Sequence, residues 1–186
     1  DFIQSSEPGE RKQYSCRIIP ERGSWIEIVA GKRGTLGIRI DQSGRFPAMT
    51  FIRALSPDYG TSESILRLFY KVTNLRLNRE DAFAKAIGTI AAHDIVYPAG
   101  HPQCGEIIVD IGGKITNEAV TEIRTAGIRA IDVIEGNPDT VALASILEDP
   151  SASHEDALLR IYQRLRPGNP PQLEKATELF AEKFFD

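Results

Sequence analysis

The sequence contains few of the residues that build disulfide frameworks and metal sites. Among its 186 residues are two cysteines, Cys16 and Cys104, and three histidines. The cysteines lack the CxxC spacing of redox or zinc motifs, so we expect both to be unpaired in a reducing compartment. His93, His101 and His154 have no carboxylate or cysteine at a ligand interval. We therefore expect no metal site in this chain.

Long apolar runs are also missing. No stretch approaches the roughly 18 residues of a membrane-spanning helix, and no basic segment followed by an apolar one marks a leader. Hydrophobic residues make up 41% and charged residues 26% of the chain, as in an ordinary globular protein. We expect a cytoplasmic protein without membrane contacts. Because the chain opens on Asp1 and stops within an apolar helical pattern, we interpret it as a piece excised from a longer protein.

A recognisable catalytic set is absent as well. No histidine stands with a serine or cysteine in a context typical of nucleophilic catalysis. Gly112-Gly113-Lys114 resembles a phosphate-binding loop only superficially, because the first glycine of GxxxxGK[ST] is missing and Ile115 follows the lysine. We interpret this segment as a tight turn. The sequence predicts no catalytic residue and no cofactor.

Charge is distributed unevenly along the chain. Residues 1–53 carry nine Lys and Arg against six Asp and Glu, a net charge of +3, whereas the remainder carries 13 against 20, a net charge of −7. The basic excess in residues 1–53 favours a partner with phosphates in that part of the chain. The acidic remainder would weaken the binding of the isolated chain to nucleic acid. Differences of this size also occur on ordinary solvated surfaces.

The most strongly patterned stretch is residues 25–41, which begins with the only tryptophan. Apolar residues alternate with others on both sides of a glycine-bounded turn, at positions 26, 28, 36, 38 and 40. This alternation predicts an antiparallel hairpin. Burying all five on one face requires that paired residue numbers sum to an even number. A sum of 66 centres the turn on Arg33 and sets Trp25 opposite Asp41 on the other face.

An outward tryptophan beside a carboxylate has two interpretations. The indole of Trp25 is a stacking platform with a hydrogen-bond acceptor, Asp41, next to it. Alternatively, a single tryptophan belongs to the core or to a subunit interface, which is the commoner role for this residue.

The remaining pattern predicts an α+β fold, mainly an antiparallel β meander with packed helices. We expect a loop at 1–13 and strands at 14–19 and 46–55. A helix capped by Thr61 or Ser62 follows and extends its apolar face to Val72. A second begins at Ser151 or Ser153 and ends before Pro167, and a third places residues 173, 176, 179, 180 and 184 inward.

Residues 78–150 have a separate strand–helix–strand pattern. It comprises a helix at 79–87 ended by Gly88 or continuing to residue 92, extended segments at 89–96 and 106–111, a helix capped by Thr116 and ended by Gly127, and a strand at 128–134. We interpret it as a small β-helix-β subdomain inserted into a body made of residues 1–77 and 151–186. Its far boundary lies near residues 136–139 or 149–150.

Several ordered motifs resemble the β subunit of bacterial DNA-directed RNA polymerase, in the part called the lobe. The resemblance runs over most of the chain and is weakest at residues 71–104. The motifs are Tyr14-Ser15-Cys16-Arg17-Ile18-Ile19-Pro20, Arg22-Gly23-Ser24-Trp25, Arg39-Ile40-Asp41, Phe46-Pro47-Ala48, Arg53-Ala54-Leu55, Ile161-Tyr162, Leu165-Arg166-Pro167-Gly168, Pro170-Pro171 and Leu179-Phe180.

This resemblance implies a non-catalytic part of a nucleotidyltransferase that carries out DNA-templated transcription. The lobe forms one wall of the cleft for downstream DNA, and Trp25, Asp41 and Arg166 match residues that contact the non-template strand. It implies downstream duplex DNA, other polymerase subunits and sigma factor as partners, and magnesium bound by another subunit. The isolated chain is expected to be inactive. The alternative is a protein-binding scaffold module in which Trp25 contacts sigma factor, another subunit or a regulator.

Overall fold

The structure is a computed structural model that describes residues 2–5, 13–31 and 33–185. It divides into two compact units, one of residues 1–65 with 140–186 and one of residues 66–139. Both combine antiparallel sheet with helices, so the predicted α+β class is confirmed.

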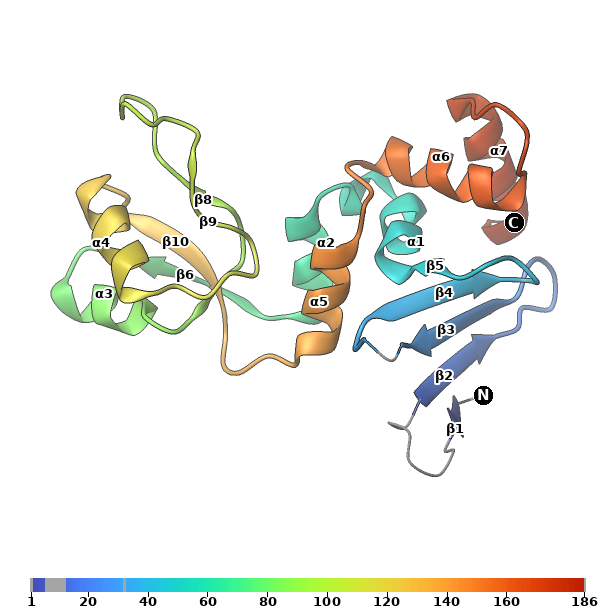
Figure 1. Ribbon diagram of the computed structural model, residues 1–186, viewed down its shortest axis with the longest axis horizontal. Helices are drawn as coiled ribbons and strands as arrows, with labels where there is room; N and C mark the ends of the chain where they lie inside the picture. Colours follow the sequence, from blue (N-terminus) through green and yellow to red (C-terminus); the bar gives the residue numbers. More distant parts are fainter. Residues whose placement is uncertain (1, 6–12, 32, 186) are drawn as a thin grey trace. The chain divides into compact units, whose positions relative to one another are not determined.

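The first unit is built on a five-stranded antiparallel sheet in which sequential strands are neighbours (Figure 1). This arrangement is the predicted meander, and the predicted register of the central hairpin is confirmed, with Ile26 opposite Ile40 and Ile28 opposite Ile38. The strands are β1 (Phe2–Ser5), β2 (Gln13–Ile18), β3 (Ile26–Ala30), β4 (Leu36–Ile40) and β5 (Phe46–Pro47).

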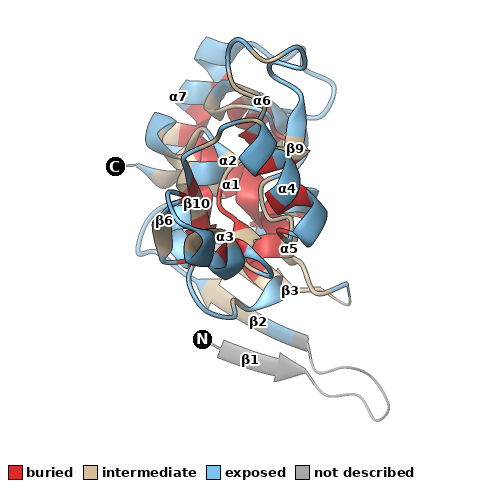
Figure 2. Ribbon diagram, turned by 90° about the vertical axis from the view of Figure 1, so that its left-hand side faces the viewer, coloured by how far each residue is buried: buried red, intermediate tan, exposed pale blue. Residues whose placement is uncertain are grey.

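Helices cover one face of this sheet and enclose the core of the first unit. Buried side chains of β4 and β5 pack against α1 (Ala48–Leu55), α6 (His154–Leu165) and α7 (Leu173–Phe184). Figure 2 shows α1 as largely buried, and six of its eight residues are. The short helix η1 (Pro57–Tyr59) follows α1, α2 (Ser62–Phe69) spans the boundary between the units, and α5 (Thr140–Glu148) contacts β4 and α1.

The second unit has its own smaller core. Its sheet has the order β6-β10-β7 and a separate hairpin pairs β8 with β9. Buried side chains of the strands, the helices and the loop before Thr116 form one cluster, which includes Ile115, Val120, Ile123 and Ile131. The elements are β6 (Val72–Arg76), α3 (Glu80–Ala86), β7 (Ile90–Ala91), β8 (Ile95–Val96), β9 (Ile107–Val109), α4 (Asn117–Thr125) and β10 (Ala130–Ile134).

Several local signals predicted from sequence are confirmed by cap geometry. Thr61, Thr116 and Ser153 each accept a hydrogen bond from the backbone N–H three residues on, so each caps its helix. Ser151 caps nothing and instead donates to Asp149. Gly127 adopts the left-handed conformation after α4, with φ of 73°, as the helix-end pattern requires.

Other predicted elements are wrong. Residues 46–55 do not form a strand: β5 ends at Pro47 and α1 begins, because the segment is rich in helix formers and packs on several sides. Residues 2–5 form β1 by pairing with β2, while 6–12 of the predicted loop lie outside the described residues. Phe69 and Leu173, predicted inward, are exposed.

The chain passes from one compact unit to the other at residues 65–66 and 139–140, and the domain bounds of 78 and 150 stay a prediction. Val72 does not extend α2, because residues 72–76 form β6 and pair with β10 of the second unit. Residues 140–148 form α5, which the sequence did not predict, and the N–H of Leu36 in β4 donates to Oγ of its Ser145 at 2.8 Å. Contacts between segments distant in sequence therefore set both boundaries. That the two units are independent domains stays a prediction.

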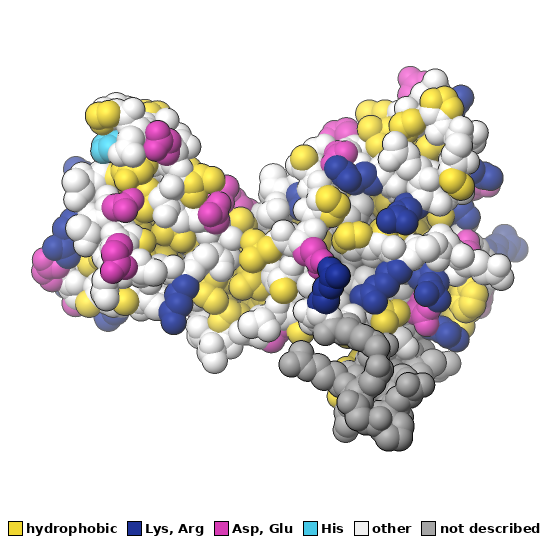
Figure 3. All heavy atoms as spheres, in the orientation of Figure 1, with side chains coloured by type: hydrophobic (Ala, Val, Ile, Leu, Met, Phe, Trp, Pro, Cys, Tyr) yellow, Lys and Arg dark blue, Asp and Glu magenta, His cyan; other side chains and the backbone are white. Residues whose placement is uncertain are grey.

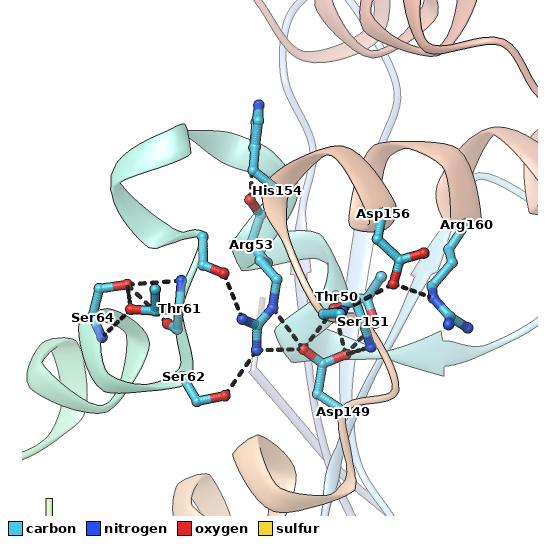
Figure 4. A network of polar contacts seen from close by, with 12 residues as sticks. Thr50, Arg53, Thr61, Ser62, Ser64, Asp149, Ser151, His154, Asp156 and Arg160 are labelled. Atoms are coloured by element: carbon cyan, nitrogen blue, oxygen red, sulfur yellow. Dashed lines mark hydrogen bonds and ion pairs between the residues drawn. The ribbon is translucent and has the colours of Figure 1, made fainter. Parts of the chain in front are cut away.

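A buried ion pair fastens α1 to the end of α5 (Figure 4). Arg53 Nε lies 3.1 Å from Asp149 Oδ2, and the two side chains are 2% and 0% exposed. The guanidinium also donates to the carbonyl of Gly60 and to Ser62 Oγ, while the carboxylate accepts from Thr50 and Ser151. The polar atoms of both groups are therefore satisfied inside the first unit.

A carboxylate on β10 makes the stability of the second unit depend on pH. Asn74 Nδ2 donates to Asp132 Oδ1 at 2.7 Å and Arg67 Nη2 to Oδ2 at 2.7 Å. The bond from Asn74 is the main reason that the pKa of the Asp132 carboxyl lies below its ordinary 3.8; the bond from Arg67 adds to this effect, and partial burial opposes it. The stabilisation is therefore complete above the ordinary pKa and is lost as pH falls through the folded one.

We accordingly expect Asp132→Asn to lower the opening free energy of the β6 and β10 amides near neutral pH. The difference from the unsubstituted chain should begin to shrink as pH falls below about 4, where the carboxyl of the unfolded state takes up a proton, and should vanish once pH is below the lowered pKa of the folded state. Amide hydrogen exchange over this range measures the difference. A difference that stays constant down to the lowest pH at which the chain is folded would contradict the assignment.

Candidate nucleic-acid interface

The central hairpin brings Trp25 and Asp41 together, as predicted. The N–H of Asp41 donates to the carbonyl of Trp25 at 3.0 Å, and the N–H of Trp25 donates to Asp41 Oδ1 at 3.1 Å. Asp41 directly follows the last residue of β4. Its φ is 50°, in the left-handed region that aspartate tolerates better than most residues. The Asp41 carboxylate therefore links the two strands of the hairpin at the end away from the turn, beside Trp25.

The indole of Trp25 remains accessible. Trp25 is 39% exposed, and it precedes β3, whose isoleucines pack toward the core. The Arg17 guanidinium lies 5.7 Å from the centroid of the ring, within the range of a cation–π contact. An aromatic ring that is exposed to solvent and contacts one guanidinium can stack on a nucleic-acid base.

The indole belongs to a groove on the sheet. The groove has a volume of about 410 Å³ and is lined by Arg17, Trp25, Glu27, Arg39, Asp41, Gln42, Ser43 and Gly44. Glu27 lies 3.1 Å from Arg17 Nε and 3.6 Å from Arg39 Nη1, so one carboxylate is shared between two guanidinium groups. On the face shown in Figure 3, Lys and Arg side chains gather over the first unit.

A lysine from the last helix completes the site and was missed by sequence reasoning. Lys183 Nζ donates to Ser24 Oγ at 3.0 Å and lies 3.5 Å from Asp41 Oδ2. Gly23, with φ of 99°, passes so close that a Cβ atom there would lie 2.8 Å from the carbonyl oxygen of Lys183. The residues before Trp25 are thus fixed against α7. No local signal could have revealed a contact across 142 residues.

Arg166 is not brought into contact with the other two predicted residues. It follows α6 as its C-cap, with φ of −130°, and is exposed, as the proline after it predicts. Among the residues that the structure describes, no hydrogen bond or ion pair joins Arg166 to Trp25 or Asp41. The structure therefore assembles two of the three predicted site residues.

Signs of other chemistry are missing from the described part of the chain. Within it, no group of three or more His, Cys, Asp or Glu side chains could hold a metal ion. Cys16 and Cys104 are both free, in agreement with the sequence. In the same described residues, every helix is too short or too polar to cross a membrane.

Comparisons with known proteins give a consistent result. No family model matches the chain. The chain is 47% identical over its whole length to the DNA-directed RNA polymerase subunit beta of Rhodopirellula baltica, of which it covers 15%. It is 34% identical over its whole length to that of Chlamydia trachomatis, covering 15%, and 32% identical over 94% of its length to that of Leptospira biflexa, covering 14%.

The chain thus spans about 15% of the length of the relatives it matches. The matches cover 94–100% of the chain. The chain belongs to the family of bacterial DNA-directed RNA polymerase β subunits and corresponds to one segment of them.

Proposed function

We propose that this chain is the lobe of an RNA polymerase β subunit, which forms part of the downstream DNA cleft and contacts the non-template strand during transcription. The observation that carries the proposal is the exposed indole of Trp25, which lies in a groove with arginines around it. Duplex DNA offers no unpaired base to such a ring, whereas the transcription bubble does. The family of the chain supports this setting.

Each residue of the site has a separate role. Trp25 stacks on an unpaired base, which is worth about 1–3 kcal/mol for an aromatic side chain. Asp41, whose Oδ1 is engaged by the hairpin, is 39% exposed at its side chain and accepts a hydrogen bond from the edge of that base. Arg166 reaches a phosphate or a base from the exposed end of α6.

The chemistry of nucleotidyl transfer belongs to other parts of the enzyme. In this proposal the chain is a non-catalytic part of a cytoplasmic polymerase, another subunit binds the magnesium, and the remaining subunits and sigma factor are partners of the whole protein. The isolated chain is inactive for this reason.

Fluorescence of a modified base tests the stacking. We would place 2-aminopurine at each non-template position of the bubble in turn and compare assembled polymerases containing Trp25 or Trp25→Ala. Stacking on an indole should quench the fluorescence at one position, and the alanine variant should relieve this quenching. The Trp25→Phe variant should retain part of it, because phenylalanine keeps a stacking surface. Equal intensities at every position with both polymerases would contradict the proposal.

A protein-binding role is the second candidate, and an apolar hollow favours it. Ile18 and Phe185, which are 51% and 52% exposed, line a hollow of about 260 Å³ between the sheet and α7. Exposed aliphatic and aromatic side chains are typical of contacts between subunits. If tryptophan fluorescence responds to sigma factor but not to single-stranded DNA, this second role is the correct one for Trp25.

A further inference from the structure

The loop after Asp41 brings a second helix to the edge of the Trp25 groove. Gly44 lines the groove, and a Cβ atom on it would lie 3.7 Å from Nη1 of Arg164. Arg164 belongs to the last turn of α6, so its guanidinium lies against the same short loop that carries the site carboxylate. A cation that the sequence did not single out is therefore next to the groove.

Arg164 differs from Arg17, Arg39 and Arg160 in its lack of a carboxylate partner among the described residues. Arg17 and Arg39 share Glu27, and Arg160 Nε donates to Asp156 Oδ2 at 2.9 Å. Among the described residues, no ion pair involves Arg164, and its side chain is exposed. Its charge is therefore available to an anion from outside the chain.

Arg164 also lines a second hollow. This hollow, of about 250 Å³, is bounded by Phe46, Pro47, Thr50, Pro150, Arg160, Gln163 and Arg164. Arg164 therefore lies close to Gly44 of the Trp25 groove and is itself part of the lining of the second hollow. A strand that leaves the groove past Gly44 would reach Arg164 first.

We propose that Arg164 binds the backbone phosphate next to the non-template base stacked on Trp25, and that the strand continues into the second hollow. This inference rests on the proposed function, because it takes the ligand to be single-stranded DNA. Phosphate contacts fix the register of a strand while the stacked base is read separately. A planar guanidinium is suited to two oxygens of one phosphate.

Arg166 cannot take this place at the same time. Arg164 belongs to the last turn of α6, whereas Arg166 is its C-cap, with a φ of −130° outside the helical region. Of the two, Arg164 is the one whose guanidinium lies within 4 Å of the Cβ position at Gly44. The two arginines therefore contact different phosphates if both bind the strand.

A single neutral linkage tests the assignment in the assembled polymerase. We would replace each non-template phosphate around the stacked base with a methylphosphonate and measure the lifetime of the open complex. At the linkage next to that base, the replacement should shorten the lifetime of the open complex about tenfold in the polymerase that retains Arg164. A factor of this size is expected for the loss of one charge-assisted hydrogen bond. Arg164→Ala should shorten the lifetime on unmodified DNA by a similar factor.

The polymerase with Arg164→Ala, measured on DNA with the methylphosphonate, tests whether the side chain and this phosphate contact each other. Arg164→Ala and the neutral linkage should together cost no more than either alone, because both remove one contact. In the Arg164→Lys polymerase, the lifetime should keep most of its sensitivity to the methylphosphonate. In the Arg166→Ala polymerase, this sensitivity should be unchanged. Additive effects of Arg164→Ala and the methylphosphonate, or loss of the sensitivity with Arg166→Ala, would overturn the assignment. If 2-aminopurine quenching by Trp25 persists in that case, the proposed function stands without this inference.

Discussion

Arg53→Ala is expected to lower the unfolding free energy of this chain by about 3–5 kcal/mol, the range for removing one partner of a buried ion pair. The substitution leaves the carboxylate of Asp149, whose side chain is 0% exposed, without its cation. Burial makes an unpaired charge far more costly than the same charge at the surface. This loss is a large fraction of a typical domain's stability, which is about 5–15 kcal/mol.

The position of the pair explains the size of the effect. Arg53 fastens α1 to the loop at Gly60 and to Ser62 at the start of α2, while Asp149 holds the end of α5 through Thr50 and Ser151. Loss of the guanidinium therefore removes several hydrogen bonds as well as the ion pair. We expect Asp149→Ala to be similarly destabilising, because the buried guanidinium of Arg53 then lacks its carboxylate partner.

Urea unfolding followed by circular dichroism measures these changes, with Arg160→Ala as the matched control. Arg160 also pairs with an aspartate, but its side chain is 43% exposed. Exposed pairs contribute about 0–1 kcal/mol, so this control should unfold at nearly the original urea concentration. If Arg53→Ala were no more destabilising than Arg160→Ala, the buried pair would not hold the first unit together.

Local sequence signals predicted those features that depend on neighbouring residues. The period-two alternation of residues 26–40 defined the hairpin register, and with it the meeting of Trp25 with Asp41, because a one-residue slip would expose the isoleucines. Thr116 and Gly127 marked the two ends of α4 for equally local reasons, one as a hydrogen-bond acceptor and one through its conformational freedom.

Features that depend on distant residues could not be predicted in this way. The apolar positions of residues 46–55 suit a strand or a helix, and packing of α1 against α6 and the sheet decides between them. Asp149 lies 96 residues from Arg53, and Lys183 lies 142 residues from Asp41. Arg164 likewise has no local mark that distinguishes it from Arg160 or Arg166. The site could therefore be predicted only in part.

Trp25→Ala is expected to have the largest effect on function. Loss of the stacked base should cost about 1–3 kcal/mol in the assembled polymerase, or about 5- to 150-fold in the stability of the open complex. The fold should be little affected. Trp25 is 39% exposed, and its contact with Arg17 is worth about 0.5–1 kcal/mol at an exposed site.

Two comparisons separate a stacking role from a structural one. Trp25→Phe should recover part of the open-complex stability, because the aromatic face is retained. Urea unfolding of the Trp25→Ala chain should show a loss of no more than about 1 kcal/mol, since no core cavity is created. A loss of several kcal/mol would instead indicate that the indole supports the fold.

The central claim, that Trp25 holds an unpaired non-template base, is tested most directly by the lifetime of the open complex on templates that differ at one non-template position. With Trp25, the lifetime should depend on the identity of the base at that position and should fall sharply when the base is replaced by an abasic site. With Trp25→Ala, the lifetime should be shorter and equal on all of these templates. Unchanged lifetime and unchanged base preference in the Trp25→Ala polymerase would contradict the account.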